Sequence, residues 1–190
     1  EKAFQKTAPH QLDASGKLYS HSVLETEIAR ANTAIYQAAQ SQPQYAGMGT
    51  TLVVTLFYDN AITVAHIGDS RLYRLRGGEF RQITRDHSLL QEQIDSGMIT
   101  VEQARNSQNK NLVTRAVGVE DTVLLETHLH DVLPGDMYLL CSDGLCDMVA
   151  DDDILGILAA APTLDDAARA LVRAANTEGG EDNVTVVLFR

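Results

Sequence analysis

Two aspartates in the second half of the sequence stand where a carboxylate could do chemistry. Asp143 follows the apolar run 137–141 and precedes Gly144, and Asp182 lies in the glycine-rich turn 179–183 before a final apolar run. Glycine lets the backbone turn with positive φ, which leaves a carboxylate projecting where a strand stops. Mg2+ and Mn2+ prefer carboxylate oxygens, so the pair could share an ion. Taken singly, each Asp-Gly or Asp-Asn pair is an ordinary turn.

The elements that must position these aspartates follow from the hydrophobic periodicity. Apolar residues at steps of three and four predict a helix over 22–40, and capping boxes predict helix starts at Thr100 and Thr163. Further helices are expected over 88–96 and 151–161, and strands over 50–58, 61–67, 71–76, 123–129, 137–141 and 184–189. Consecutive strands are expected to pair as hairpins. The last strand is expected to be central, because its apolar run is continuous.

This order of elements defines the fold class. Antiparallel strands with grouped helices, rather than strict alternation, indicate an α+β layered domain with two sheets flanked by helices. A length of 190 residues suits one domain over 1–190.

Composition removes several classes of partner. The net charge of −11 repels nucleic acid phosphates. The sequence contains neither a long apolar span nor a secretory signal, so we expect a cytoplasmic protein without membrane insertion. Two cysteines, Cys141 and Cys146, are too few and too close for a disulfide framework or a zinc site, and we expect them to be reduced and buried.

Several short motifs occur in a fixed order from about Leu24 to the end of the chain. They are Gly-Met-Gly-Thr-Thr at 47–51, Ala-His-Ile-Gly-Asp-Ser-Arg-Leu-Tyr at 65–73, Ile-Thr-Arg-Asp-His-Ser at 83–88, Leu-Val-Thr-Arg-Ala-Val-Gly at 112–118, Leu-Cys-Ser-Asp-Gly-Leu at 140–145 and Gly-Gly-Glu-Asp-Asn-Val-Thr at 179–185. In this order and spacing they resemble the protein phosphatase 2C family of bacterial type.

That resemblance implies a fold and an activity. The fold would be a four-layer αββα sandwich of the α+β class, with a helical flap over 86–118. The activity would be hydrolysis of phosphoserine and phosphothreonine in proteins by a water that two Mn2+ or Mg2+ ions activate. The partners would be phosphorylated protein substrates of a serine/threonine kinase.

The resemblance also assigns roles to individual residues. Asp143 and Asp182 match the family's two C-terminal metal aspartates, and Asp86 matches an aspartate that holds a third, weaker ion near the flap. Asp69 would lie close to the metals and orient ligands, although a turn aspartate that pairs with Arg71 explains its position equally well.

Two further residues are expected to support the site. Asn183 would fix its turn by hydrogen bonds to the backbone, and Gly144 would accompany Asp143. No catalytic residue beyond the metal ligands can be assigned.

The family's N-terminal motifs, an arginine with Asn-Glu/Gln-Asp and then Asp-Gly-x-Gly-Gly-His, do not occur in this sequence. Two explanations stay open. The sequence begins inside an active phosphatase, with its first strands and metal motifs missing, or it is a non-catalytic phosphatase-like binding and regulatory module. A calcium-binding loop is disfavoured, because Asp151 to Asp153 are better explained as negative charge at a helix N-terminus.

Overall fold

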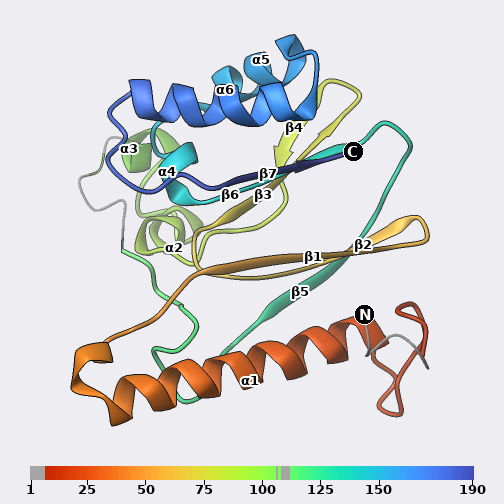
Figure 1. The fold of residues 1–190 in the computed structure, drawn as a ribbon, viewed down its shortest axis with the longest axis vertical. Helices are drawn as coiled ribbons and strands as arrows, with labels where there is room; N and C mark the ends of the chain where they lie inside the picture. Colours follow the sequence, from red (N-terminus) through yellow and green to blue (C-terminus); the bar gives the residue numbers. More distant parts are fainter. Residues whose placement is uncertain (1–6, 106, 108–111) are drawn as a thin grey trace. The chain divides into compact units, whose positions relative to one another are not determined.

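The computed structural model describes residues 7–105, 107 and 112–190. The chain divides into two compact units, which we call unit 1 (Glu1–Gly68 and His87–Val132) and unit 2 (Asp69–Asp86 and Leu133–Arg190). Each unit contains one antiparallel sheet accompanied by helices (Figure 1). The expected α+β class is therefore confirmed.

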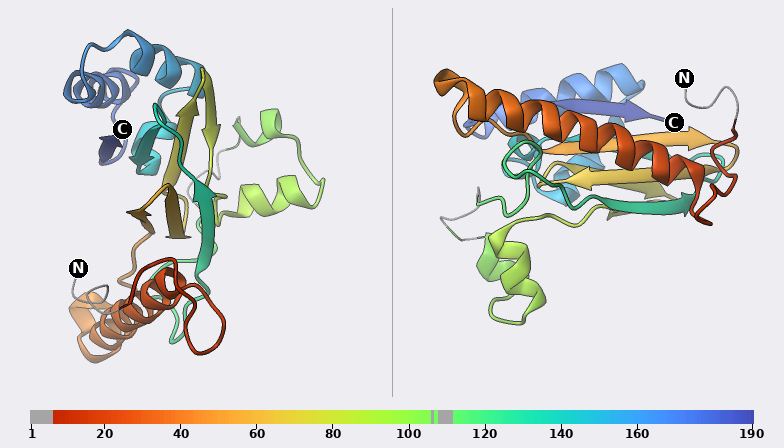
Figure 2. Two further views of the ribbon diagram at one scale, coloured as in Figure 1. Left: turned by 90° about the vertical axis from the view of Figure 1, so that its right-hand side faces the viewer. Right: turned by 90° about the horizontal axis from the view of Figure 1, so that it is seen from below.

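Unit 1 is built on a three-stranded sheet in the order β1-β2-β5. Its strands are β1 (Leu52–Tyr58), β2 (Ala61–Ile67) and β5 (Glu126–Asp131). The long helix α1 (Tyr19–Ser41) runs along this sheet, as Figures 1 and 2 show, and is followed by the short 3-10 helix η2 (Pro43–Tyr45). Ile28 of α1 is buried in one cluster with Ala65 and Ile67 of β2, so the apolar stripe of the predicted helix does face the sheet.

A buried amide ties α1 to the loop that precedes β5. Asn32 is 1% exposed, accepts a hydrogen bond from the Gly118 amide (2.7 Å) and donates to the Glu120 carbonyl (3.0 Å). Gly118 has a φ of +88°, and a Cβ there would lie 2.1 Å from Cγ2 of Ile35. Only glycine fits this close approach.

Two short helices of unit 1, α2 (Leu89–Asp95) and α3 (Val101–Arg105), project from the strands as a pair (Figure 2). The predicted Thr100 capping box is present, and Ser88 caps α2 as well. The Ser88 hydroxyl accepts the Gln91 amide (3.3 Å), and Thr100 and Gln103 exchange side-chain-to-backbone bonds of 2.7 and 3.2 Å. Part of the expected flap, residues 106 and 108–111, lies outside the described residues, and the flap stays a prediction.

Unit 2 is built on a four-stranded sheet in the order β4-β3-β6-β7. Its strands are β3 (Arg71–Arg76), β4 (Glu79–Gln82), β6 (Met137–Cys141) and β7 (Val186–Phe189), and its helices are α4 (Asp143–Cys146), α5 (Asp151–Ala160) and α6 (Leu164–Thr177). Figure 1 shows α5 and α6 over the sheet. Their buried side chains Ile154 and Leu171 pack with Tyr73, Leu139 and Leu145 in one core.

The starts of these two helices follow the sequence prediction. Thr163 accepts the Asp166 amide (3.1 Å) and donates to the Asp166 carboxylate (2.7 Å), which is the predicted capping arrangement. Helix α5 begins at Asp151, so its three acidic residues lie where the helix dipole favours negative charge.

Two expectations about strand pairing were wrong. The consecutive strands β2 and β3, and likewise β5 and β6, lie in different sheets, and β3 pairs with β6 instead. Period-two alternation shows that a segment is a strand but not which strand it pairs with. The last strand was expected to be central, but within the described residues β7 is an edge strand, and Val187 is 51% exposed. A short apolar run fits an edge strand with one covered face equally well.

Two smaller observations concern the helices and the cysteines. In the part of the chain that the structure describes, no helix is both long enough and apolar enough to cross a membrane. Cys141 and Cys146 are free thiols, as expected, although only Cys141 is fully buried.

Candidate metal centre

The segments that carry Asp143 and Asp182 lie side by side in unit 2. Ser142 binds the second segment three times: its amide donates to the Thr185 carbonyl (3.2 Å), its hydroxyl donates to the Asn183 carbonyl (3.1 Å), and that hydroxyl accepts the Thr185 amide (3.0 Å). Strand pairing of β6 with β7 begins at the adjacent pair Cys141 and Val186. The structure therefore brings the two predicted aspartates to one end of this strand pair.

Gly144 makes this close approach possible. A Cβ on Gly144 would lie 2.5 Å from the Asn183 carbonyl oxygen and 3.5 Å from the Asp182 carbonyl carbon. The sequence suggested a turn glycine, but Gly144 belongs to α4, a short helix that the sequence analysis did not anticipate. In the turn before Asp182, both Gly179 (φ +138°) and Gly180 (φ +59°) have positive φ.

Local hydrogen bonds orient both carboxylates. Oδ1 of Asp143 accepts the Gly144 amide (2.9 Å), and Oδ1 of Asp182 accepts the Asn183 amide (2.6 Å). The bonds that the structure gives Asn183 come from its backbone, whereas the sequence analysis expected its side chain to fix the turn. One oxygen of each carboxylate is thus committed to its own turn.

Asp69 lies close to Asp143 and is 8% exposed. Burial, and then the negative charges of Asp143, Asp86 and Asp147, raise the pKa of Asp69 to about 6. We call these four residues, Asp69, Asp86, Asp143 and Asp147, the acidic cluster. The raised pKa shows that this environment disfavours another negative charge unless a cation compensates it.

Asp147 is a member of the cluster that sequence reasoning missed. It follows Asp143 by four residues and caps the C-terminus of α4. Residues at this spacing share one face of a helical turn. The signal was present in the sequence, but it depends on knowing that 143–146 is helical.

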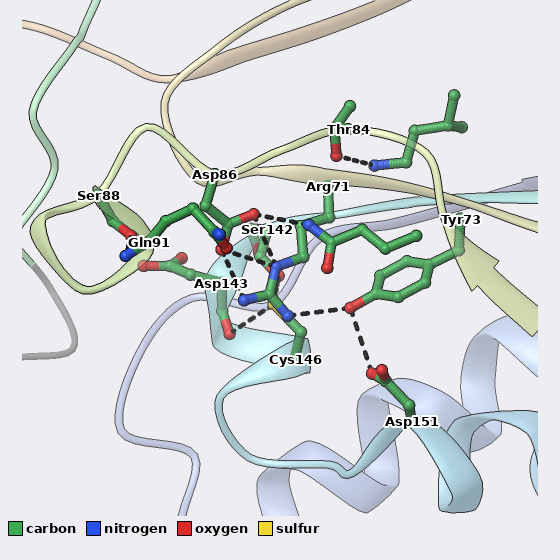
Figure 3. A network of polar contacts seen from close by, with 12 residues as sticks. Arg71, Tyr73, Thr84, Asp86, Ser88, Gln91, Ser142, Asp143, Cys146 and Asp151 are labelled. Atoms are coloured by element: carbon green, nitrogen blue, oxygen red, sulfur yellow. Dashed lines mark hydrogen bonds and ion pairs between the residues drawn. The ribbon is translucent and has the colours of Figure 1, made fainter. Parts of the chain in front are cut away.

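Arg71 pairs with Asp86, whereas the alternative in the sequence analysis paired it with Asp69. Arg71 donates from Nε to both Asp86 oxygens (3.0 Å each) and from Nη2 to Oδ2 (2.6 Å), so the predicted alternative in which Arg71 pairs with Asp69 does not describe these contacts. Nη1 of Arg71 also donates to the Tyr73 hydroxyl (3.0 Å), which reaches Asp151 (3.3 Å). Figure 3 shows the guanidinium between Asp86 and Tyr73.

A second group of possible ligands lies in unit 1. Among the described residues, His66, His87 and Glu126 are the one set of histidine, cysteine or acidic side chains whose ligand atoms all lie within 4.8 Å of one another. Nδ1 of His87 accepts the Gly68 amide (3.1 Å), so the ring proton of neutral His87 is on Nε2, which faces Glu126 at 3.1 Å.

The geometry of these three residues does not favour a metal site. His87 has no free lone pair in that tautomer, and the two imidazole rings stack at 4.8 Å with an interplanar angle of 16°, which keeps their in-plane lone pairs from converging on one ion. Burial would raise the pKa of Glu126, but its contacts with His87 and His66 outweigh burial and lower that pKa.

The acidic cluster fits a hard divalent cation better. Its donors are carboxylates alone, which suit Mg2+ and Mn2+, and burial together with the neighbouring negative charges raises the pKa of Asp69. Asp143 on α4 and Asp182 on the neighbouring segment would supply the oxygens, with Asp69 and Asp147 as further negative charges beside Asp143. Asp86 is the exception, because Arg71 engages both of its oxygens.

Comparison with known proteins identifies the family of this chain. The model of the family Protein phosphatase 2C matches residues 2–184. The serine/threonine phosphatase stp of Listeria welshimeri is 41% identical over 165 residues, which cover 87% of this chain and 66% of that protein.

Solved structures agree as well. The serine/threonine phosphatase PstP/Ppp of Mycobacterium tuberculosis is 43% identical with a TM-score of 0.79, over 83% of this chain and 66% of that one. The catalytic domain of a serine threonine protein phosphatase PstP in complex with 2 manganese ions is 41% identical with a TM-score of 0.80, over 88% and 69%.

The chain belongs to the protein phosphatase 2C family. The expected α+β fold of that family is confirmed. The chain spans 66% of the length of the Listeria relative that it matches.

Proposed function

We propose that the protein is a metal-dependent serine/threonine phosphatase whose acidic cluster, with Asp182, binds Mn2+ or Mg2+. The observation that carries the proposal is the juxtaposition of the segments of Asp143 and Asp182 through Ser142 and Gly144, beside a buried Asp69 with a raised pKa. The relatives named above are phosphatases, and one was solved with two manganese ions.

Bound ions would activate a water and neutralise charge on the phosphoryl oxygens. Asp143 and Asp182 would hold the ions through the oxygens that their turns leave uncommitted. Asp69 and Asp147 would add negative charge and orient the ligands.

A cysteine nucleophile does not fit this site. The hydrogen bond with Cys141, together with burial, raises the pKa of the Cys146 thiol well above its ordinary value. Only the thiolate is an effective nucleophile, so Cys146 stays unreactive near neutral pH. Direct attack by water on the phosphoester, without a covalent phospho-enzyme, is the chemistry that the remaining residues support.

The substrates that follow from this chemistry are phosphoserine and phosphothreonine in proteins, placed there by a serine/threonine kinase. We place the protein in the cytoplasm, where such kinase substrates occur. The net charge of −11 does not favour nucleic acid.

Mn2+-dependent hydrolysis of p-nitrophenyl phosphate and of a phosphothreonine peptide tests the proposal. It should be measured for this chain and for the full open reading frame that encodes it. Asp143→Asn and Asp182→Asn should each lower the rate by about 100-fold or more, because each removes charge stabilisation at the reacting phosphate. Asp165→Asn, at an exposed position on α6, is the matched control and should leave the rate unchanged.

The assay also separates the two explanations of the sequence. If the protein encoded by the full open reading frame hydrolyses these substrates, and Asp143→Asn abolishes the hydrolysis, the result supports the phosphatase. If this chain and the protein encoded by the full open reading frame both bind Mn2+ but hydrolyse neither substrate, the result would instead support a non-catalytic binding module.

A further inference from the structure

Two arginines face each other across neighbouring strands of unit 2. Arg74 of β3 pairs directly with Arg81 of β4 in the antiparallel register. Residues in such a pair lie on the same face of the sheet, with their Cβ atoms about 5 Å apart. Like charges directly opposite each other repel, so this pair destabilises the hairpin unless an anion compensates it.

The pair lies on the face of the sheet that α5 and α6 do not cover. Tyr73 and Leu75, the neighbours of Arg74 along β3, pack in the core with the buried side chains of those helices. Side chains alternate between the two faces of a strand, so Arg74 and Arg81 lie on the opposite face. Arg81 is exposed and Arg74 is half-buried.

The chain supplies no counter-ion for these two arginines. Among the described residues, neither Arg74 nor Arg81 forms an ion pair or a side-chain hydrogen bond, and Nε of Arg74 is buried without a partner. Glu79 of β4 is exposed and, within the same set of residues, has no ion pair with either arginine. A buried donor without an acceptor costs free energy, and such atoms are rare in folded proteins.

The acid on this face is already engaged by other groups. Asp136 accepts from Nε and Nη2 of Arg76 (2.8 and 2.7 Å), from the Leu133 amide (2.9 Å) and from the Tyr138 hydroxyl (3.2 Å). An ionised carboxylate has about four acceptor sites. Asp136 therefore has no capacity left to neutralise Arg74, which lies opposite Tyr138 in the sheet.

We propose that Arg74 and Arg81 together bind a phosphoryl dianion, either inorganic phosphate or the phosphate group of a phosphorylated peptide. A guanidinium group presents its donors in a planar fork that matches phosphate oxygens. A phosphate between the two side chains would accept from both and remove their mutual repulsion. The site needs no metal ion and does not rest on the proposed function. Along β3, Arg74 is three residues, about 10 Å, from Arg71 beside the acidic cluster.

Binding of inorganic phosphate at pH 7.5, followed by the broadening of its phosphorus NMR signal, tests the inference. Buffers passed over a chelating resin leave the acidic cluster without cations, so its carboxylates repel phosphate. Arg74→Gln and Arg81→Gln should each weaken phosphate binding by about 10-fold, because each removes one charged donor. Arg169→Gln, which makes the same charge change at an exposed position on α6, should bind phosphate within about twofold of the parent.

Reversing one charge provides a second readout, which loss of structure would not give. Arg81→Glu should abolish phosphate binding and raise the melting temperature in phosphate-free buffer by about 1–4 °C, because opposite charges would then face each other across the strands. Circular dichroism checks that each variant is folded. The comparison is made without phosphate, since phosphate stabilises folded proteins in general.

Three results would each overturn the inference: a parent chain that does not broaden the phosphate signal, an Arg81→Gln variant that binds as tightly as the parent, and an Arg81→Glu variant that melts below the parent. A phosphothreonine peptide and its unphosphorylated form identify the source of the phosphate group. Binding of the phosphopeptide about 10-fold tighter than inorganic phosphate, and lost in Arg81→Gln, would assign the site to a phosphorylated protein. Equal affinities would assign it to the free ion.

Discussion

Gly144→Ala is expected to lower the free energy of unfolding by about 2–4 kcal/mol and to abolish Mn2+ binding. The added methyl group would lie 2.5 Å from the Asn183 carbonyl oxygen and 3.1 Å from its carbonyl carbon. Both are backbone atoms, so relief requires the segment of Asp182 to move away from Asp143. Urea unfolding followed by circular dichroism, and a Mn2+ titration, measure the two effects.

Gly156→Ala is the matched control for that substitution. Gly156 lies inside α5, and a Cβ there would meet no atom within 4 Å. Alanine has the higher helix propensity, so this variant should be more stable than the parent by about 0.5–1 kcal/mol and bind Mn2+ normally. If the two variants behaved alike, Gly144 would not be the residue that permits the close approach of the two metal segments.

Asp69→Asn is expected to stabilise the metal-free protein at neutral pH by about 3 kcal/mol. Burial, with Asp143, Asp86 and Asp147, raises the pKa of Asp69 from 3.8 to about 6. Between these values the folded state keeps a proton that the unfolded state has released. Stability therefore falls as pH rises through this range, and the full cost of the charged Asp69 is present above pH 6.

Chemical unfolding in EDTA at pH 4 and pH 7.5 measures this difference. Asp69→Asn should exceed the parent in stability at pH 7.5 and match it at pH 4. Asp165→Asn, whose side chain is 74% exposed in the parent, should change stability by less than about 0.5 kcal/mol at both pH values. Equal stability of Asp69→Asn and the parent at pH 7.5 would show that the acidic cluster does not strain Asp69.

Local signals in the sequence predicted the elements well. The helix predicted from the periodicity of 22–40 is present as α1, and the predicted capping boxes at Thr100 and Thr163 begin α3 and α6. These features depend on residues three or four apart, which one segment contains by itself. The partition of the strands into two sheets depends on contacts between distant segments, such as β3 with β6, and periodicity does not contain that information.

The site shows the same division. The motifs located Asp143 and Asp182, and the structure places their segments together. Asp147 could be recognised only once α4 was known to be helical. The pairing of Arg71 with Asp86 could be recognised only once the path of the chain from β3 to Asp86 was known. Whether a carboxylate is free to bind a cation depends on its neighbours in space, which the sequence motif of Asp86 does not reveal.

The dependence of the melting temperature on Mn2+, compared between the parent chain and Asp143→Asn, tests most directly whether the acidic cluster is a cation site. At a hundredfold excess of Mn2+ over its Kd, binding should stabilise the parent by about 2.7 kcal/mol, or about 5–10 °C for a chain of this size. Asp143→Asn should show almost no shift relative to its own metal-free melting temperature. An unresponsive parent, or equal shifts in both proteins, would contradict the account.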